Sequence, residues 1–240
     1  MIKTNKVYND NCLIGLKHID SNSIDLVVTD PPYSVIGGGN AERGTNGFPK
    51  SVLNRNDGKI FDFNDIDFKD WMPEVYRVLK DNTHFYCMTN VINLEEVLRV
   101  GRECGFKLHN VLVWEKGSTN PNRWYMKNCE FTVFFYKGQA KTINNPGSQQ
   151  VHMFKNPVGN KLHPTEKPVD LFKFYIENSS QKGDLVLDPF MGSGTTAVAC
   201  KECGRNFIGF EIDPKFYEVI EERLKDTKED TPLGGLFDLE

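Results

Sequence analysis

Residues 184–196 read DLVLDPFMGSGTT, and this stretch decides the fold. It predicts a short buried strand, a glycine turn and the start of a helix. Gly192 and Gly194 let the backbone turn sharply and come close to a ligand. Thr195 or Thr196 can cap the helix that follows the turn.

An acidic residue further along the chain extends this pattern. Glu211 lies nineteen residues after Gly192, at the end of the next expected strand, 206–212. An acid at that distance fits hydrogen bonding to ribose hydroxyls. Ala197 stands where a dinucleotide fingerprint has its third glycine, and a helix N-terminus also suits a carboxylate such as that of S-adenosylmethionine. The pattern therefore favours a nucleotide-like cofactor over its alternative, a plain tight turn.

A second polar motif follows the β-branched run 23–29, which predicts another buried strand. Asp30 can accept a hydrogen bond from an NH2 group and stabilise the positive charge that develops as its nitrogen attacks a methyl group. Pro31 and Pro32 fix the chain and expose the Pro31 carbonyl as a second acceptor. Tyr33 offers an aromatic face on which an extruded base can stack. The alternative is a rigid surface turn.

Strands and helices alternate along much of the remaining chain. Further strands are expected at 83–89, 111–114, 131–136 and 185–187, and helices at 68–80, 91–104, 169–178, 195–203 and 216–225. This alternation predicts an α/β fold, with a mostly parallel sheet covered by helices on both faces. Residues 34–60 show little periodicity, which favours a long mobile loop. The stretches 117–128 and 140–162 are also polar and aperiodic.

Charge is distributed unevenly along the chain. The net charge is −4, yet residues 107–167 carry +6 and the remainder therefore carries −10. A basic middle suits a surface that faces phosphates, although a solvated face with chance asymmetry is equally compatible.

Several classes of site and location are disfavoured. No Pro-Cys dipeptide occurs, which argues against methylation at carbon 5 of cytosine, because that reaction needs a thiolate. Cys200 and Cys203 have C-x-x-C spacing without a second ligand pair, so we favour two apolar helix residues over a zinc site and expect no metal. The chain lacks a signal peptide and any bilayer-length apolar run, so we expect a cytoplasmic protein without membrane contact.

The ordered motifs resemble those of the amino-group DNA methyltransferases. Residues 30–33 look like catalytic motif IV, 188–196 like motif I, 163–168 (HPTEKP) like motif X, 209–213 (GFEID) like motif II, and 9–12 like the segment whose Asp meets the cofactor adenine. The catalytic motif precedes the cofactor motif, as in the β group of the family. Taken alone, residues 163–168 fit a proline-bounded linker before a helix.

The resemblance implies a Rossmann-like S-adenosylmethionine-dependent methyltransferase fold with circularly permuted motif order. Its mostly parallel sheet would have seven strands with helices on both faces. Residues 1–240 would form a single catalytic domain with the mobile loop 34–60 and a small target-recognition insert at about 117–162. The implied cofactor is S-adenosylmethionine and the implied partner is double-stranded DNA. Homodimers are common in the β group, although no residue pattern here indicates one.

The resemblance also assigns roles to residues. The catalytic residues would be Asp30, Pro31, Pro32 and Tyr33. The cofactor would meet Asp10, Asn11, Cys12, Asp30, Thr165, Lys167, Asp188, Phe190, Gly192, Ser193, Gly194, Thr195, Glu211 and Ile212. Among these, Glu211 would hold the ribose and Asp10 the adenine. The DNA-binding residues would be Arg43, Lys50, Arg55, Lys116, Asn120, Arg123, Trp124, Lys127, Lys141 and Lys155. Residues 117–128 alone fit equally well a surface loop with one core Trp.

The first residue of the catalytic motif favours one target base. In this family an initial Asp leans toward adenine and an initial Ser toward cytosine, so Asp30 favours N6 of adenine over N4 of cytosine. Methylation of RNA or of a protein glutamine amide is a second alternative, which the motif order and the basic insert argue against. A DNA-binding protein without catalysis is a third, which the intact Asp30, Tyr33 and glycines argue against.

Overall fold

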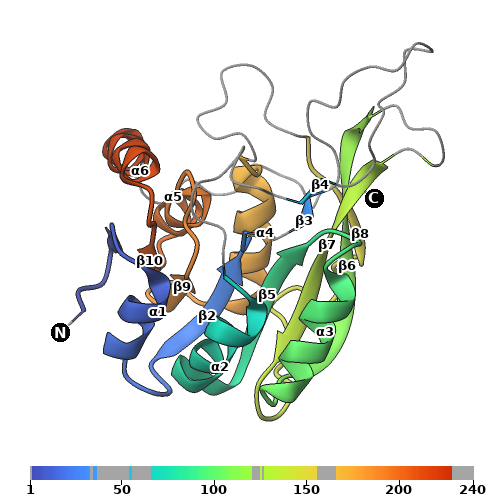
Figure 1. The fold of residues 1–240 in the computed structure, drawn as a ribbon, viewed down its shortest axis with the longest axis horizontal. Helices are drawn as coiled ribbons and strands as arrows, with labels where there is room; N and C mark the ends of the chain where they lie inside the picture. Colours follow the sequence, from blue (N-terminus) through green and yellow to red (C-terminus); the bar gives the residue numbers. More distant parts are fainter. Residues whose placement is uncertain are drawn as a thin grey trace.

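The computed structural model describes residues 2–32, 35–36, 54–55, 66–120, 125, 127–155 and 166–228. Within these residues, one mixed sheet has the strand order β1-β10-β9-β2-β5-β7-β6-β8 (Figure 1). Its strands are β1 (Lys6–Tyr8), β2 (Ile24–Thr29), β5 (Leu79–Thr89), β6 (Lys107–Asn120), β7 (Lys127–Tyr136), β8 (Val151–Met153), β9 (Leu185–Asp188) and β10 (Asn206–Phe210). A separate ribbon pairs β3 (Val35–Ile36) with β4 (Asn54–Arg55).

The strand order brings two distant parts of the chain together. Strands β1, β10, β9, β2 and β5 are parallel neighbours, so their carboxyl ends meet at one edge of the sheet. Strand β7 is antiparallel to both β5 and β6, and β8 is parallel to β6. The N-terminal strand β2 lies directly beside the C-terminal strand β9, and in such sheets ligands bind beyond the carboxyl ends of the strands.

Helices cover both faces of this sheet (Figure 1). One face is covered by α1 (Cys12–Gly15), η1 (Leu16–His18), α2 (Phe68–Val78) and α3 (Leu94–Glu103). The other is covered by α4 (Val169–Ser179), α5 (Thr195–Glu202) and α6 (Pro214–Asp226). Alternate side chains of β5 point to opposite cores: Phe85 and Cys87 pack against the first group, and Tyr86 and Met88 against the second.

Most expected elements are confirmed. The strands expected at 23–29, 83–89, 111–114, 131–136, 185–187 and 206–212 all fall on strands, and the five expected helices lie within about three residues of their expected ends. Helix α2 ends two residues early, because Leu79 is extended and already pairs with β2. The short elements β1, α1 and η1 have too few residues for a periodic pattern, and the sequence did not indicate them.

Two expectations need correction. The sheet has eight strands in the described residues instead of seven, because β8 pairs with β6 inside the expected insert. Six of the twelve residues in the polar stretch 117–128, where the sequence indicated no strand, belong to the ends of β6 and β7, and Asn120 pairs with Lys127. Polar side chains hide such strand ends from a pattern that looks for one apolar face. The expected loop 34–60 lies mostly outside the described residues.

Cys200 and Cys203 are both buried in the core beneath α5, in keeping with their interpretation as apolar helix residues. No helix in the described part of the chain is both long and apolar enough to cross a bilayer.

A helical glycine provides a test of the packing between α3 and the sheet. Alanine normally stabilises a helix interior by about 1 kcal/mol relative to glycine. At Gly101, however, a Cβ atom would lie 2.4 Å from Cζ of Phe135, a fully buried ring on β7. We therefore expect Gly101→Ala to lower the free energy of unfolding by about 1–3 kcal/mol in urea titrations followed by circular dichroism.

The control combines this change with Phe135→Leu, which removes the obstructing ring edge. The double variant is expected to lose less stability than the two single variants together. A Gly101→Ala protein more stable than the native one would contradict the packing.

Candidate active site and cofactor site

Four carboxyl side chains follow the ends of four neighbouring parallel strands. Asp10 comes two residues after β1, Glu211 directly follows β10, Asp188 ends β9, and Asp30 directly follows β2. The pairing of Tyr8 with Phe210 and of Gly209 with Asp188 brings these ends into line. The two motifs identified in the sequence are therefore adjacent in space.

Asp188 holds the turn between β9 and α5. Its Oδ1 accepts hydrogen bonds from the Thr29 hydroxyl at 2.6 Å and from the backbone N–H of Phe190 at 3.0 Å, and its Oδ2 accepts one from the Thr196 hydroxyl. Burial raises the pKa of the Asp188 carboxyl to about 6, and these hydrogen bonds oppose the rise. Asp188 thus shapes the cofactor loop through contacts within the protein.

The glycine turn adopts the backbone conformation that its sequence predicts. Gly192 and Gly194 have φ values of 54° and 84°, which L-residues rarely adopt. A Cβ at Gly194 would also lie 3.0 Å from Ile220 of α6. Ser193 is buried between them, and its carbonyl and hydroxyl oxygens accept hydrogen bonds from Arg223 at 2.8 and 3.1 Å. The tight turn brings the start of α5, with its free backbone N–H groups, to the edge of the sheet.

Glu211 bridges the two loops on either side of it. It accepts hydrogen bonds from the backbone N–H groups of Gly192 and Asp213, both at 2.8 Å. Burial raises the pKa of Glu211 to about 7, although both hydrogen bonds favour the ionised form. A carboxylate has room for further donors, so ribose hydroxyls can bind to the same group.

The segment after β1 presents one carboxylate to solvent. Asp10 is exposed and accepts a hydrogen bond from the Asn11 N–H at 2.8 Å. Asn11 caps α1 by accepting from the Leu13 N–H, and Cys12 is buried in the core. Of the three residues expected to meet the cofactor here, Asp10 is therefore the one with an available side chain. Ile212, 38% exposed, supplies an apolar surface beside Glu211.

A network of ion pairs surrounds the catalytic candidate Asp30. Its Oδ2 lies 2.6 Å from Nζ of Lys167, and the same ammonium group lies 3.5 Å from Oε2 of Glu130 on β7. The other oxygen of Glu130 pairs with Lys116 on β6. Burial alone would lower the pKa of Lys167, but Asp30 and Glu130 outweigh it, so the pKa is raised and the side chain stays protonated.

The remaining motif residues pack around this network. Pro31 is buried and Pro32 is half-buried, whereas Tyr33 lies outside the described residues. The Phe190 ring packs edge-on against Trp71, with centroids 5.0 Å apart. The Thr195 side chain is buried near the carbonyl of Lys167, and Thr165 lies outside the described residues.

The residues expected to bind DNA fall into three groups. Lys127 and Lys155 are exposed near the ends of β7 and β8, on the edge that carries Asp30. Lys116 lies near this edge too, but its ammonium group is paired with Glu130. Lys141 lies instead toward the opposite edge, because the antiparallel β7 carries the chain away from Asp30. Its carbonyl is 2.9 Å from Nε2 of His84, which pairs with Tyr136 at the end of β7.

The third group cannot be placed. Arg43, Lys50, Arg123 and Trp124 lie outside the described residues, and only the backbones of Arg55 and Asn120 are described.

Four contributing residues were not singled out from the sequence: Thr29, Glu130, Glu166 and Arg223. Arg223 lies 3.2 Å from Glu166 and also holds Ser193, so it links α6 to both cofactor motifs. Glu166 belongs to the segment 163–168 quoted above, which was the available signal. Glu130 and Thr29 carry no local signal, since their partners are far away in the chain.

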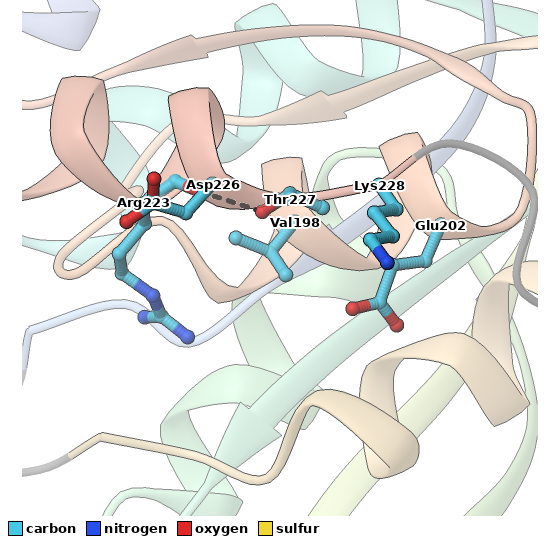
Figure 2. A pocket seen from close by; sticks show the side chains of 6 residues that line it. All are labelled: Val198, Glu202, Arg223, Asp226, Thr227 and Lys228. Carbon is cyan, nitrogen blue, oxygen red and sulfur yellow. Dashed lines mark hydrogen bonds between the residues drawn. The ribbon is translucent and has the colours of Figure 1, made fainter.

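A surface hollow lies between α5 and α6, lined by Val198, Glu202, Arg223, Asp226, Thr227 and Lys228 (Figure 2). None of the four strand-end carboxylates lines it. It is therefore separate from the site built at the edge of the sheet.

Comparison with known proteins identifies the family. The DNA methylase family matches residues 24–222. The type II methyltransferase M2.MboI of Moraxella bovis is 32% identical over 246 residues, covering 92% of this chain and 88% of the relative. M.HinfI of Haemophilus influenzae is 30% identical over 250 residues, covering 93% of this chain and 69% of the relative.

Solved structures support the same conclusion. The M1.HpyAVI–SAM complex has a TM-score of 0.69 at 25% identity, over 91% of this chain and 98% of that one. The cytosine-N4-specific PvuII DNA methyltransferase shares the fold, with a TM-score of 0.67 at 18% identity over 96% of both chains. The resemblance drawn from the motifs and the expected Rossmann-like fold are thereby confirmed. This chain belongs to the amino-group DNA methylase family, whose cofactor is S-adenosylmethionine.

Proposed function

We propose that this protein transfers a methyl group from S-adenosylmethionine to N6 of adenine at a specific site in double-stranded DNA. The observation that carries the proposal is the position of Asp30 and Pro31 beside the cofactor loop, with one Asp30 oxygen held by Lys167. The Asp30 carboxylate, which can accept several hydrogen bonds, and the Pro31 carbonyl supply acceptors for an amino group. The type II methyltransferase relatives support DNA as the substrate.

The cofactor is assigned to the edge formed by β1, β10 and β9. Glu211 would accept from the ribose hydroxyls and Asp10 from the adenine, with Ile212 against the adenine face. The turn 190–195 and Lys167, together with the motif residue Thr165, would surround the methionyl part. Bound there, S-adenosylmethionine supplies an activated methyl group. Cys12 and Asp188 contribute by supporting the loops.

The reaction then follows from the chain's own groups. The target adenine is flipped out of the duplex and stacks on Tyr33. Asp30 and the Pro31 carbonyl would orient the amine, and Asp30 would stabilise the positive charge that develops on its nitrogen as the nitrogen takes up the methyl group. A proton leaves the nitrogen afterwards. Lys127 and Lys155, which are exposed on the same edge of the sheet, would meet DNA phosphates. Homodimerisation stays a prediction.

The direct test is transfer of labelled methyl groups from S-adenosylmethionine to unmethylated genomic DNA, followed by nucleoside analysis. N6-methyladenine supports the proposal. N4-methylcytosine would keep the mechanism but refute the choice of base. The PvuII DNA methyltransferase, which has the same fold, is specific for N4 of cytosine. An absence of label in DNA would refute DNA as the substrate of the isolated chain.

Removal of the catalytic carboxylate tests the role of Asp30. We expect Asp30→Ala to lower the single-turnover rate at least about 100-fold, because the developing charge loses its partner. Affinity for S-adenosylhomocysteine, whose sulfur is neutral, should change little, and Glu130 still compensates the buried Lys167. The matched control is Asp25→Asn, which alters a carboxylate at the other end of β2 and should retain transfer. Near-normal turnover by Asp30→Ala would refute the assignment.

The raised pKa of Glu211, about 7, predicts a pH-dependent cofactor affinity. Ribose hydroxyls donate to the ionised carboxylate, so binding favours deprotonation and strengthens as pH rises through 7. Calorimetry with S-adenosylhomocysteine should show about tenfold weaker binding at about pH 6 than at about pH 8. Glu211→Gln should bind weakly at both values and lose the dependence. A pH-independent affinity in the native protein would contradict the ribose assignment.

A further inference from the structure

Four charged side chains of alternating sign form a continuous chain into the site. Lys116 pairs with Oε1 of Glu130, Oε2 of Glu130 lies 3.5 Å from Nζ of Lys167, and Lys167 lies 2.6 Å from Oδ2 of Asp30. All four are largely buried, with side-chain exposures of 20%, 25%, 10% and 18% in that order. Ion pairs in such surroundings are screened by water much less than pairs on the surface.

The two inner members of this chain, Glu130 and Lys167, are held in their charged forms by their neighbours. Burial favours the neutral form of Glu130, but Lys167 and Lys116 outweigh it, and the pKa of Glu130 is lowered. The pKa of Lys167 is raised by Asp30 and Glu130 in spite of its burial. The arrangement is therefore a fixed pattern of charges.

The pattern resolves a conflict at the catalytic carboxylate. A single lysine on Asp30 would fix its orientation but also cancel the negative charge that must stabilise a cationic methyl donor and a developing ammonium. Glu130 shares that lysine, so its negative charge offsets the positive charge of Lys167 next to Asp30. Lys116 holds the far oxygen of Glu130, which keeps the near oxygen directed at Lys167.

We propose that Glu130 is a positioning residue that, through Lys167, keeps the field at Asp30 negative while Lys167 keeps Asp30 oriented. This inference rests on the proposed role of Asp30 in methyl transfer. It gives Lys167 an electrostatic task in addition to any contact with the cofactor. It also makes Lys116, expected from the sequence to bind DNA, the outer anchor of the catalytic network.

The charge of the cofactor itself provides a readout that does not depend on turnover. S-adenosylmethionine carries a positive sulfonium, whereas S-adenosylhomocysteine has a neutral sulfur in the same position. The ratio of their dissociation constants therefore reports the electrostatic field where the methyl group is transferred. If the role of Glu130 were purely structural, its substitution would weaken the binding of both ligands by the same factor.

The experiment measures both dissociation constants by calorimetry for native protein, Glu130→Gln and Lys116→Met. Glu130→Gln is expected to shift the ratio about three- to tenfold against S-adenosylmethionine, because it removes the charge that offsets Lys167. Lys116→Met should shift the ratio in the opposite direction by a smaller factor, because it removes a cation. A shift of the ratio in favour of S-adenosylmethionine cannot result from loss of folding. Lys116→Met therefore keeps the test decisive if Glu130→Gln is unstable.

The matched control is Glu115→Gln. Trp114 pairs with Glu130 across the strands, so these two side chains share one face of the sheet. Glu115 is the next residue along β6, so its side chain points to the other face. The substitution makes the same charge change near the same edge, and the ratio should stay at its native value. If Glu130→Gln leaves the ratio of the two dissociation constants at its native value, the inference is overturned.

Single-turnover methylation of DNA gives the second measurement. The methyl-transfer rate of Glu130→Gln is expected to fall about tenfold, while Glu115→Gln stays at the native rate. If the native protein transfers no methyl group to DNA, the proposed function fails, but the ratio of dissociation constants still decides the role of Glu130. A native rate in Glu130→Gln would refute its part in catalysis.

Discussion

The buried carboxylate of Asp188 is the interaction on which the site depends. It accepts hydrogen bonds from Thr29 at the end of β2, from Phe190 in the loop and from Thr196 at the start of α5. These donors belong to β2, which leads to Asp30, to the loop after β9 and to α5 behind that loop. Removing the carboxylate would leave the two buried hydroxyl groups and the half-buried Phe190 N–H without this partner, which is costly for each of them. One side chain therefore fixes the end of β2 relative to the loop after β9 and the start of α5.

Two consecutive residues before α4, Glu166 and Lys167, make a second connection between the glycine turn and Asp30. Glu166 pairs with Arg223, which also binds Ser193 in the glycine turn, and Lys167 pairs with Asp30. Because the two residues are adjacent, the glycine turn and Asp30 are connected through a single peptide unit. Methyl transfer needs close alignment between donor and acceptor, and rigid links of this kind supply it.

The sequence predicts those parts of the molecule that are encoded locally. Gly192, Gly194 and Asp30 were found because a glycine turn or a proline pair leaves a signature within a few residues. The buried strands and the longer helices were found because their apolar periodicity extends over enough positions. Strand β8 has three residues with mixed exposure, so it gives no such signal.

The partners within the site are encoded globally. Asp30, Glu130 and Lys167 are separated by 100 and 37 residues, and only the strand order brings them together. For Lys141 the sequence predicted a position that the fold does not give. It belongs to the basic stretch and was expected to bind DNA, but the antiparallel β7 carries the chain away from the edge with Asp30. Composition identifies a basic segment, whereas the direction of each strand decides which of its charges face the site.

The same strand order separates two charge requirements that otherwise conflict. A sulfonium donor and a developing ammonium need carboxylates, whereas DNA needs cations, and the protein as a whole has a net charge of −4. The four strand-end carboxyl groups follow β1, β10, β9 and β2, whereas the exposed Lys127 and Lys155 lie along β7 and β8. Lys167 and Glu130 stand at the boundary between these halves. An acidic protein can therefore bring a polyanion to one half of an edge and hold a cationic methyl donor at the other.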